Sequence, residues 1–229
     1  MLEARDITLD YGGSRILHGI DLTADEGAVT CVMGLNGTGK TSLLKAIAGR
    51  HPAAGTLMVD GDEPGQGAKA RAQAGIAYVP QGREIFPQLT VQENLEVGLA
   101  CLPRDARQLP DTVFTLFPVL DDMRGRRGGD LSGGQQQQLA IARALVTQPK
   151  VLLLDEPTEG IQPNIIAMIG RVIRDLRDAG GMAIVLVEQR FDFAWDLADR
   201  IVALRRGAVI RDEARAGAER EAVLADVSV

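Results

Sequence analysis

The run from Gly34 to Thr41 has the residue types and the spacing of a phosphate-binding loop. It reads Gly-Leu-Asn-Gly-Thr-Gly-Lys-Thr and matches the pattern G-x-x-x-x-G-K-[ST]. Glycines lack a Cβ atom, so backbone N–H groups can curl around a phosphate at a helix N-terminus, where the helix dipole favours negative charge. Lys40 adds a positive charge, and the hydroxyl of Thr41 can hold Mg²⁺. A glycine turn with a surface lysine is the alternative, but the apolar stretch before the run and the helical pattern after it favour phosphate binding.

Two adjacent acids follow an apolar stretch much later in the chain. Asp155 and Glu156 end the run that begins with Val151–Leu154, and the alternation of side chains along a strand points the two acids in different directions. Asp155 suits Mg²⁺ coordination, while Glu156 suits a general base that polarises an attacking water. A strand that merely ends in a polar turn is the alternative.

A second glycine-rich segment lies between these two motifs. Leu131–Gln135 reads Leu-Ser-Gly-Gly-Gln, and a helical pattern follows from Gln136 to Leu145. The free N–H groups at such a helix N-terminus offer a second cradle for phosphate. A helix cap that binds no ligand is the alternative.

Strand and helix patterns alternate around these motifs, which predicts a mainly parallel α/β sheet with helices on both faces. Gly61–Ala74 is polar and glycine-rich, and we expect a surface loop there. Residues 90–147 have no strand pattern, and prolines at 103, 110 and 118 break their helical patterns, so we expect an inserted helical subdomain within one domain of residues 1–229. The expected strands are Ile7–Leu9, Ile16–Leu22, Val29–Met33, Thr56–Val59, Ile76–Val79, Val151–Leu154, Met182–Val187 and Ile201–Leu204, and the other expected helices begin at Thr41 and cover Ile165–Leu176 and Phe191–Leu197.

Composition limits the partners and the location. The 229 residues have a formal net charge of -6, which gives no basic field for a nucleic-acid backbone. Cys31 and Cys101 lack metal-ligand spacing, and we expect both to be buried, reduced side chains. The first residues show no secretory signal, and the apolar runs are far shorter than the roughly 18 residues that span a bilayer. We therefore expect a cytoplasmic protein whose membrane role depends on partner subunits.

The order of the three motifs resembles that of ABC-type ATPases, and the resemblance extends from Tyr11 to about Gly207. It implies a P-loop NTPase core with an antiparallel N-terminal β subdomain, ATP and Mg²⁺ as cofactors, and a head-to-tail dimer in which Leu131–Gln135 closes over the partner's γ-phosphate. Tyr11 resembles the residue that stacks on adenine, and Gln81 resembles the glutamine that reaches Mg²⁺ and the attacking water. The residues expected to bind ATP are Tyr11, Gly34, Leu35, Asn36, Gly37, Thr38, Gly39, Lys40, Thr41, Ser42, Gln81, Ser132, Gly133, Gly134 and Gln135, those expected to bind the metal are Thr41, Gln81 and Asp155, and those expected to be catalytic are Glu156 and Gln189.

Gln189 occupies the place where this family usually has a switch histidine. A glutamine can donate a hydrogen bond to the γ-phosphate, but it cannot become cationic. The only histidines, His18 and His51, lie early in the chain. We therefore expect this chain's own site to be the weaker of two in an asymmetric motor.

Finer features are similar to the ATPases of importers for branched-chain amino acids and for urea or short amides. Gln81–Val91 and the terminal glutamine of Leu186–Gln189 are shared with that group, and Glu156–Pro163 looks most like the urea branch, with the branched-chain amino acid importers as the alternative. The resemblance implies a second, non-identical ATPase as partner (a homodimer being the alternative), two transmembrane permeases, an indirect link to a solute-binding protein, no nucleic acid, and a position on the inner face of the cell membrane. A non-transport ABC ATPase fits less well because it usually has a coiled-coil insertion or two fused units, and a P-loop kinase would not explain Leu131–Gln135.

Overall fold

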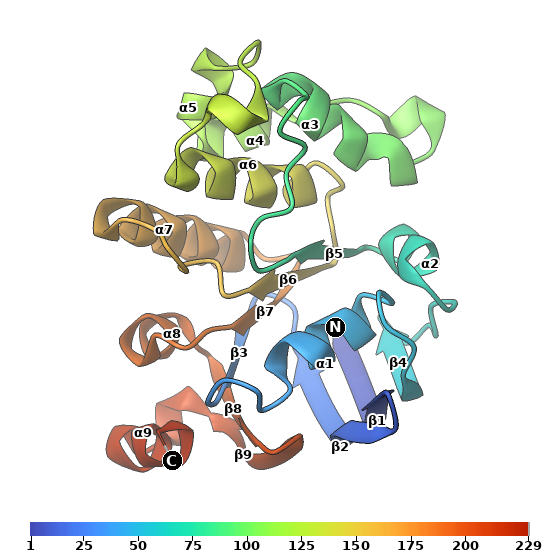
Figure 1. The fold of residues 1–229 in the computed structure, drawn as a ribbon, viewed down its shortest axis with the longest axis vertical. Helices are drawn as coiled ribbons and strands as arrows, with labels where there is room; N and C mark the ends of the chain where they lie inside the picture. The colour runs from blue at the N-terminus through green and yellow to red at the C-terminus, as the bar shows by residue number, and fades with distance from the viewer. Residues whose placement is uncertain (229) are drawn as a thin grey trace.

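Two β-sheets form in the computed structural model of the protein, which describes residues 1–228 (Figure 1). The first sheet is antiparallel, with the order β2-β1-β4, and the second has the order β5-β6-β7-β3-β8-β9. In the second sheet only β9 runs antiparallel, against β8, so the predicted fold class is confirmed. The strands are β1 (Leu2–Tyr11), β2 (Ser14–Ala24), β3 (Val29–Met33), β4 (Ala54–Val59), β5 (Ile76–Val79), β6 (Val151–Asp155), β7 (Ala183–Val187), β8 (Arg200–Arg205) and β9 (Ala208–Ala214).

Helices cover the six-stranded sheet and gather at one end of the molecule between β5 and β6 (Figure 1). None of the helices within residues 1–228 is long and apolar enough to cross a membrane. The α-helices are α1 (Lys40–Ile47), α2 (Ala68–Gln73), α3 (Val91–Gly98), α4 (Asp111–Leu116), α5 (Pro118–Asp122), α6 (Gly133–Leu145), α7 (Pro163–Ala179), α8 (Phe191–Leu197) and α9 (Arg220–Val227), and the 3₁₀ turns are η1 (Leu99–Cys101), η2 (Arg104–Ala106), η3 (Gly128–Asp130) and η4 (Arg215–Gly217).

The central strands are buried on both faces, as a parallel sheet between layers requires. In β3, Cys31 and Met33 pack into a core shared with α6, α7 and α8, whereas Val32 packs into a second core shared with α1 and the antiparallel sheet. The amphipathic helix α7 buries Ile169 and Val172 in the first of these cores. Side chains that alternate along β3 therefore pack into two different cores, one on each face of the sheet.

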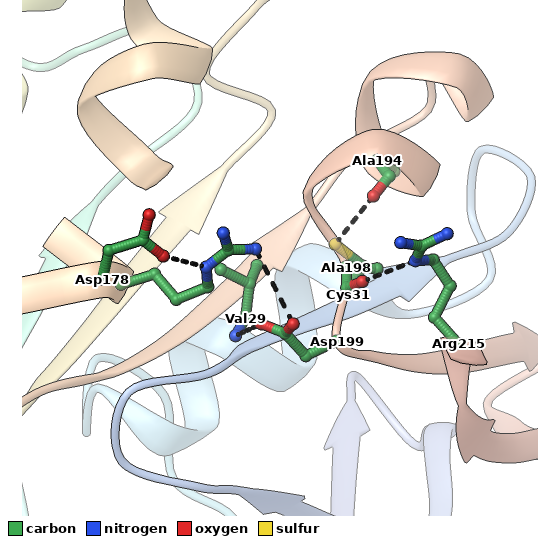
Figure 2. Close-up of polar contacts among 8 residues, drawn as sticks. Val29, Cys31, Asp178, Ala194, Ala198, Asp199 and Arg215 are labelled. Carbon is green, nitrogen blue, oxygen red and sulfur yellow. Dashed lines mark hydrogen bonds and ion pairs between the residues drawn. The ribbon is translucent and has the colours of Figure 1, made fainter. Parts of the chain in front are cut away.

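Polar contacts fix the N-terminal end of β3 to the neighbouring elements (Figure 2). The carboxylate of Asp199 accepts a hydrogen bond from the backbone N–H of Val29 at 2.9 Å and lies 3.7 Å from the guanidinium of Arg177 on α7. The thiol of Cys31 donates to the carbonyl oxygen of Ala194 at 3.4 Å, and burial raises the pKa of this thiol, so it stays protonated. The expectation of a buried, reduced thiol is confirmed for Cys31, whereas Cys101 is free but only half-buried.

Two segments differ from the sequence-based expectation. Helix α2 lies inside Gly61–Ala74, which we expected to be a loop; its sequence, Ala-Lys-Ala-Arg-Ala-Gln, consists of strong helix formers. Strand β9 and helix α9 were not predicted, because β9 is a partly exposed edge strand rich in charged residues. Strands β1 and β2 are also longer than expected, since antiparallel pairing extends the hairpin on both sides of its apolar centre.

Between β5 and β6, residues 91–145 contain helices and no strand, as expected. Pro103 and Pro110 lie at the N-cap positions of η2 and α4, and Pro118 is the first residue of α5. Each proline thus lies at the start of a new helix. The fixed φ of proline suits this position. The division of the chain into one domain with an inserted helical subdomain at residues 90–147 remains our interpretation.

Candidate functional site

A cleft of about 710 Å³ lies at the carboxyl ends of four parallel strands. The segments that line it follow β3, β5, β6 and β7, and the hairpin between β1 and β2 closes one side. Ligands of open parallel sheets bind at this edge, and the volume is typical of a pocket for a small molecule or cofactor. The lining residues are Tyr11, Ile16, Asn36, Gly37, Gly39, Lys40, Thr41, Ser42, Gln81, Glu156, Thr158, Glu159, Gly160, Glu188, Gln189 and Arg190.

The phosphate-binding loop wraps around the amine of Lys40. The Nζ atom is buried and donates hydrogen bonds to the carbonyl oxygens of Gly34 at 2.7 Å and Leu35 at 2.8 Å. Burial lowers the pKa of Lys40, and the carboxylates of Glu156, Asp155 and Glu188 oppose this effect. Lys40 is therefore a desolvated cation in the lining of the cleft, where an anionic group binds most strongly.

Two glycines give the loop its shape. Gly39 has a φ of 103° directly before α1, a conformation that favours glycine, and Gly34 has a φ of 148°. A Cβ atom on Gly34 would lie 2.4 Å from the carbonyl oxygen of Leu204, so β8 leaves room for glycine alone. Gly34, Leu35 and Thr38 do not line the cleft; Thr38 Oγ1 instead donates to the carbonyl oxygen of Leu35 at 2.9 Å and supports the loop.

Asp155 lies just beneath the cleft rather than in its wall. Its buried carboxylate accepts hydrogen bonds from Thr41 Oγ1 at 3.0 Å and from the hydroxyl of Tyr78 at 2.9 Å. Burial raises the pKa of Asp155, although the two hydrogen bonds lower it. Tyr78 is not among the expected site residues, because a tyrosine inside an apolar strand is typical of a core residue.

The oxygen atoms of Asp155 and Thr41 fit Mg²⁺. Carboxylate and hydroxyl oxygens are hard ligands of the kind that this ion prefers, and the two groups are in contact at 3.0 Å. Gln81, the third residue expected at the metal, directs its amide nitrogen to Glu156 and Glu159, and its amide oxygen is also a hard ligand. No group of three or more His, Cys, Asp or Glu side chains suited to a metal occurs within residues 1–228. Mg²⁺ commonly takes one or two carboxylates and completes its shell with substrate phosphates and water, so the residues present are a suitable set.

Glu156 is the meeting point of three chain segments. It has a φ of 47°, so the chain turns sharply after β6, and its carboxylate has other partners than the carboxylate of Asp155. Gln189 Nε2 donates to Glu156 Oε1 at 2.6 Å, and Gln81 Nε2 lies 3.4 Å from Glu156 Oε2 and 3.0 Å from the carboxylate of Glu159. Two amides thus hold the carboxylate that we expect to act as the base.

Glu188 is a buried acid at the cleft that sequence reasoning did not select. Its carboxylate accepts hydrogen bonds from Thr158 Oγ1 at 2.8 Å and from the backbone N–H groups of Gln189 at 2.9 Å and Arg190 at 3.2 Å. Burial raises the pKa of Glu188, and these hydrogen bonds oppose it. Glu188 follows an apolar strand, as the acids Asp155 and Glu156 follow an apolar run, and this pattern is the sequence feature by which it could have been selected. The contacts place Glu188 as a support for the Gln189 turn.

Tyr11 lines the cleft and is 38% exposed. Its ring packs edge-on against His51, with 4.1 Å between the ring centroids and an angle of 63° between the ring planes. Much of the phenol therefore remains available for contact with a ligand.

Ser132, Gly133, Gly134 and Gln135 do not line the cleft. They begin α6 with a capping box, in which Ser132 Oγ accepts from the N–H of Gln135 at 3.3 Å and Gln135 Oε1 accepts from the N–H of Ser132 at 2.9 Å. A serine hydroxyl can donate one hydrogen bond while it accepts others, so the capping role leaves the donor capacity of Ser132 free. Within one chain, the phosphate-binding loop and this helix start are separate.

Known proteins are similar to this chain over most of its length. The family model described as "ABC transporter" matches residues 17–159. The high-affinity branched-chain amino acid transport ATP-binding protein of Pseudomonas aeruginosa is 39% identical over 213 residues, which are 92% of this chain and 91% of that protein. A probable branched-chain amino acid transport ATP-binding protein of Archaeoglobus fulgidus is 35% identical, with coverage of 91% and 90%. A solved ATP-binding cassette, described as a dimer in a post-hydrolysis state bound to ADP and Pi, is 26% identical with a TM-score of 0.83 and covers 95% of this chain and 100% of its own. This chain therefore belongs to the ABC transporter family, as an ATP-binding subunit that couples ATP hydrolysis to transport.

Proposed function

We propose that this chain is a motor subunit of an importer for branched-chain amino acids. The observation that carries the proposal is the 39% identity to a branched-chain amino acid transport ATPase over 92% of the chain. The sequence features led us to expect urea or short amides first, and the comparisons support the amino-acid alternative better. An Fe(3+) import ATPase of Rhodococcus jostii is also 35% identical to this chain. Because ATPases for different solutes have similar sequences, a direct measurement of uptake identifies the solute.

In the proposed reaction the phosphates of ATP lie on the loop formed by Gly34–Ser42. Lys40 exchanges its two carbonyl acceptors for phosphate oxygens, a charge-assisted contact that is stronger than the one it replaces. Tyr11 offers its ring to adenine. Thr41, Gln81 and Asp155 would hold Mg²⁺, which neutralises phosphate charge when bound.

Glu156 is proposed to accept a proton from the attacking water. The water oxygen bonds to the γ-phosphorus, the bond from that phosphorus to the β–γ bridging oxygen breaks, and ADP and phosphate leave. The amides of Gln189 and Gln81 fix the carboxylate of Glu156, so the base meets the water in one orientation.

The second phosphate cradle, Leu131–Gln135, is proposed to act on a partner subunit's nucleotide. Its position outside the chain's own cleft supports this arrangement, and two of the solved relatives are described as dimers. We propose a non-identical ATPase as the partner, two permeases that hold the pair on the inner face of the membrane, and a solute-binding protein that delivers the solute. The net charge of -6 favours these partners over nucleic acid.

Uptake by cells tests the solute. In cells without the native gene, we expect import of radiolabelled leucine to return with the wild-type chain and to stay absent with Lys40→Ala, while urea uptake stays the same in both. Lys69→Ala, an exposed lysine on α2, is the matched control and should restore import. If the wild-type chain restores urea uptake and leaves leucine uptake unchanged, the importer carries urea and the amino-acid proposal is wrong. If the chain co-purifies with ribosomes or DNA instead of permeases, it is not a transport ATPase.

A further inference from the structure

A second cavity, of about 200 Å³, lies at the opposite end of α1 from the phosphate-binding loop. The end of α1, the segment that follows it, β4 and the start of α2 form its wall. Three residues of the lining are basic, namely Arg50, His51 and Arg71, and none of the lining residues is acidic. In a protein with a net charge of -6, a cavity whose titratable lining residues are all basic favours an anion.

Arg71 is the strongest sign of a missing ligand. Its side chain is 7% exposed, and its Nε and Nη1 atoms are enclosed without a hydrogen-bond partner within residues 1–228. His51 Nδ1 is likewise enclosed and without a partner there. Buried donors that lack acceptors destabilise a fold, and a buried cation without a counter-charge does so more strongly.

Close packing holds the Arg71 side chain in place. A Cβ atom on Gly49 would lie 2.8 Å from Arg71 Cγ and 2.6 Å from the carbonyl carbon of Gly67, so the backbone at Gly49 packs closely against the aliphatic stem of Arg71. Arg50, by contrast, is already paired with Glu84 at 2.8 Å. The guanidinium of Arg71 is therefore a fixed group that makes no close ion pair within residues 1–228, although the charge of Glu63 acts on it from a greater distance.

We propose that this cavity is a binding site for a small oxyanion, a phosphate or a carboxylate, held by Arg71 and His51. The planar guanidinium matches the two oxygens of either group. A volume of about 200 Å³ holds about six waters at ~30 Å³ each, enough for such an anion and far less than the 710 Å³ of the nucleotide cleft.

The site is separate from the nucleotide cleft but adjoins it. His51 lines the second cavity and Tyr11 lines the cleft, and their rings are in contact at 4.1 Å. The proposal does not depend on which solute the transporter carries, nor on the catalytic roles of Glu156 and Gln189.

Side-chain NMR of the full chain tests the proposal. With Mg-ADP saturating the cleft, inorganic phosphate and acetate are titrated separately, and sodium chloride at equal ionic strength is the reference. We expect the Nε–H signal of Arg71 and the ring signals of His51 to shift and saturate with at least one of the two anions. The tighter of the two identifies the class as phosphate or carboxylate. Shifts that match those with chloride, or that never saturate, would overturn the site.

Variants link the signal to the residue. Arg71→Gln should weaken anion binding by about tenfold or more, measured by the His51 signals, because the charge and the forked donors are lost. Lys69→Gln, an exposed residue on the same helix, should bind as the wild type does. If Arg71→Gln does not fold, Arg71→Lys keeps the charge and loses the fork, and it should still bind more weakly than the wild type. Wild-type affinity in a folded Arg71 variant would show that the anion binds elsewhere.

Discussion

At the scale of single residues, Glu156 has the best-defined role to test, because two amides fix its carboxylate. Glu156→Gln keeps the shape and removes the basicity, and general-base catalysis contributes about 10²–10⁴-fold to rate. We expect the variant to bind ATP and to lose turnover by a factor in that range, measured by single-turnover hydrolysis in the assembled complex. Glu159→Gln is the control, since Glu159 contacts Gln81 but not the proposed water. Equal losses in both variants would point to the charge of the cleft instead of a base.

Gln189 stands where we expected a switch histidine from the resemblance, and its amide donates a hydrogen bond to Glu156 at 2.6 Å. A histidine here can hold that carboxylate and also become cationic near the charge that develops on the γ-phosphate. We expect Gln189→His to raise kcat in the reconstituted complex and to leave nucleotide affinity nearly unchanged. An equal or lower kcat would mean that the glutamine already fills the switch role, and the proposed weaker site would lose its support.

Asp155 couples function to stability. Burial raises its pKa, so its ionised form destabilises the folded, nucleotide-free protein. For an acid with a raised folded pKa, this destabilisation is fully present above the folded pKa and vanishes as pH falls below the unfolded pKa. We expect Asp155→Asn to raise the Tm of the nucleotide-free chain at neutral pH, by less as the pH becomes acidic, and to weaken Mg-ATP binding.

Scanning calorimetry at neutral and acidic pH measures this difference. Asp105→Asn is the control, since Asp105 is exposed on η2. A Tm gain for Asp155→Asn that stays constant with pH would contradict an electrostatic origin. Burial also raises the pKa of Glu188. Glu188 is present in both the wild type and Asp155→Asn, so its contribution to the Tm cancels when the two are compared.

At the scale of elements, the strands and the helices that follow the glycine-rich motifs could be predicted, because their apolar patterns are uninterrupted. Val29–Met33 and Ile76–Val79 match β3 and β5 residue for residue. The contacts of Tyr78 and Glu188 could not be predicted, because they depend on the register between neighbouring strands. Thus Tyr78 on β5 reaches the carboxylate at the end of β6, and no local pattern encodes that pairing.

Helix α3 begins with a complete capping box. Thr90 Oγ1 accepts from the N–H of Glu93 at 3.2 Å, and the carboxylate of Glu93 accepts from the N–H of Thr90 at 2.7 Å. We expect Thr90→Ala to lower the free energy of unfolding by about 1 kcal/mol, because removal of the cap leaves a backbone donor of α3 unpaired. Chemical denaturation measures the change, and Thr112→Ala, an exposed position on α4, should cost much less. Equal losses would show that the cap contributes nothing specific.

At the scale of the whole molecule, Leu131–Gln135 lies outside the chain's own cleft, as the proposed two-subunit site requires. We expect the isolated chain to be a monomer or a weak dimer with slow hydrolysis, and its turnover to rise when the partner ATPase and the permeases are added. ATPase assays with and without these partners, together with sedimentation velocity, measure both. Ser132→Arg should reduce the rise, because the larger side chain blocks the partner's phosphate. Equal turnover of a monomeric chain with and without its partners would contradict the shared site.

The same separation has a genetic meaning. A defect in Lys40 and a defect in Ser132 would damage two different composite sites, although both lie in one gene. If two copies of this chain pair with each other, alleles carrying one defect each can rebuild one intact site in a mixed pair, and a heterozygous strain would recover part of its growth. If this chain pairs only with a different ATPase, each complex contains a single copy, mixed pairs never form, and the two alleles fail to complement. Complementation between the two alleles would therefore distinguish a chain that pairs with itself from one that pairs only with a different ATPase.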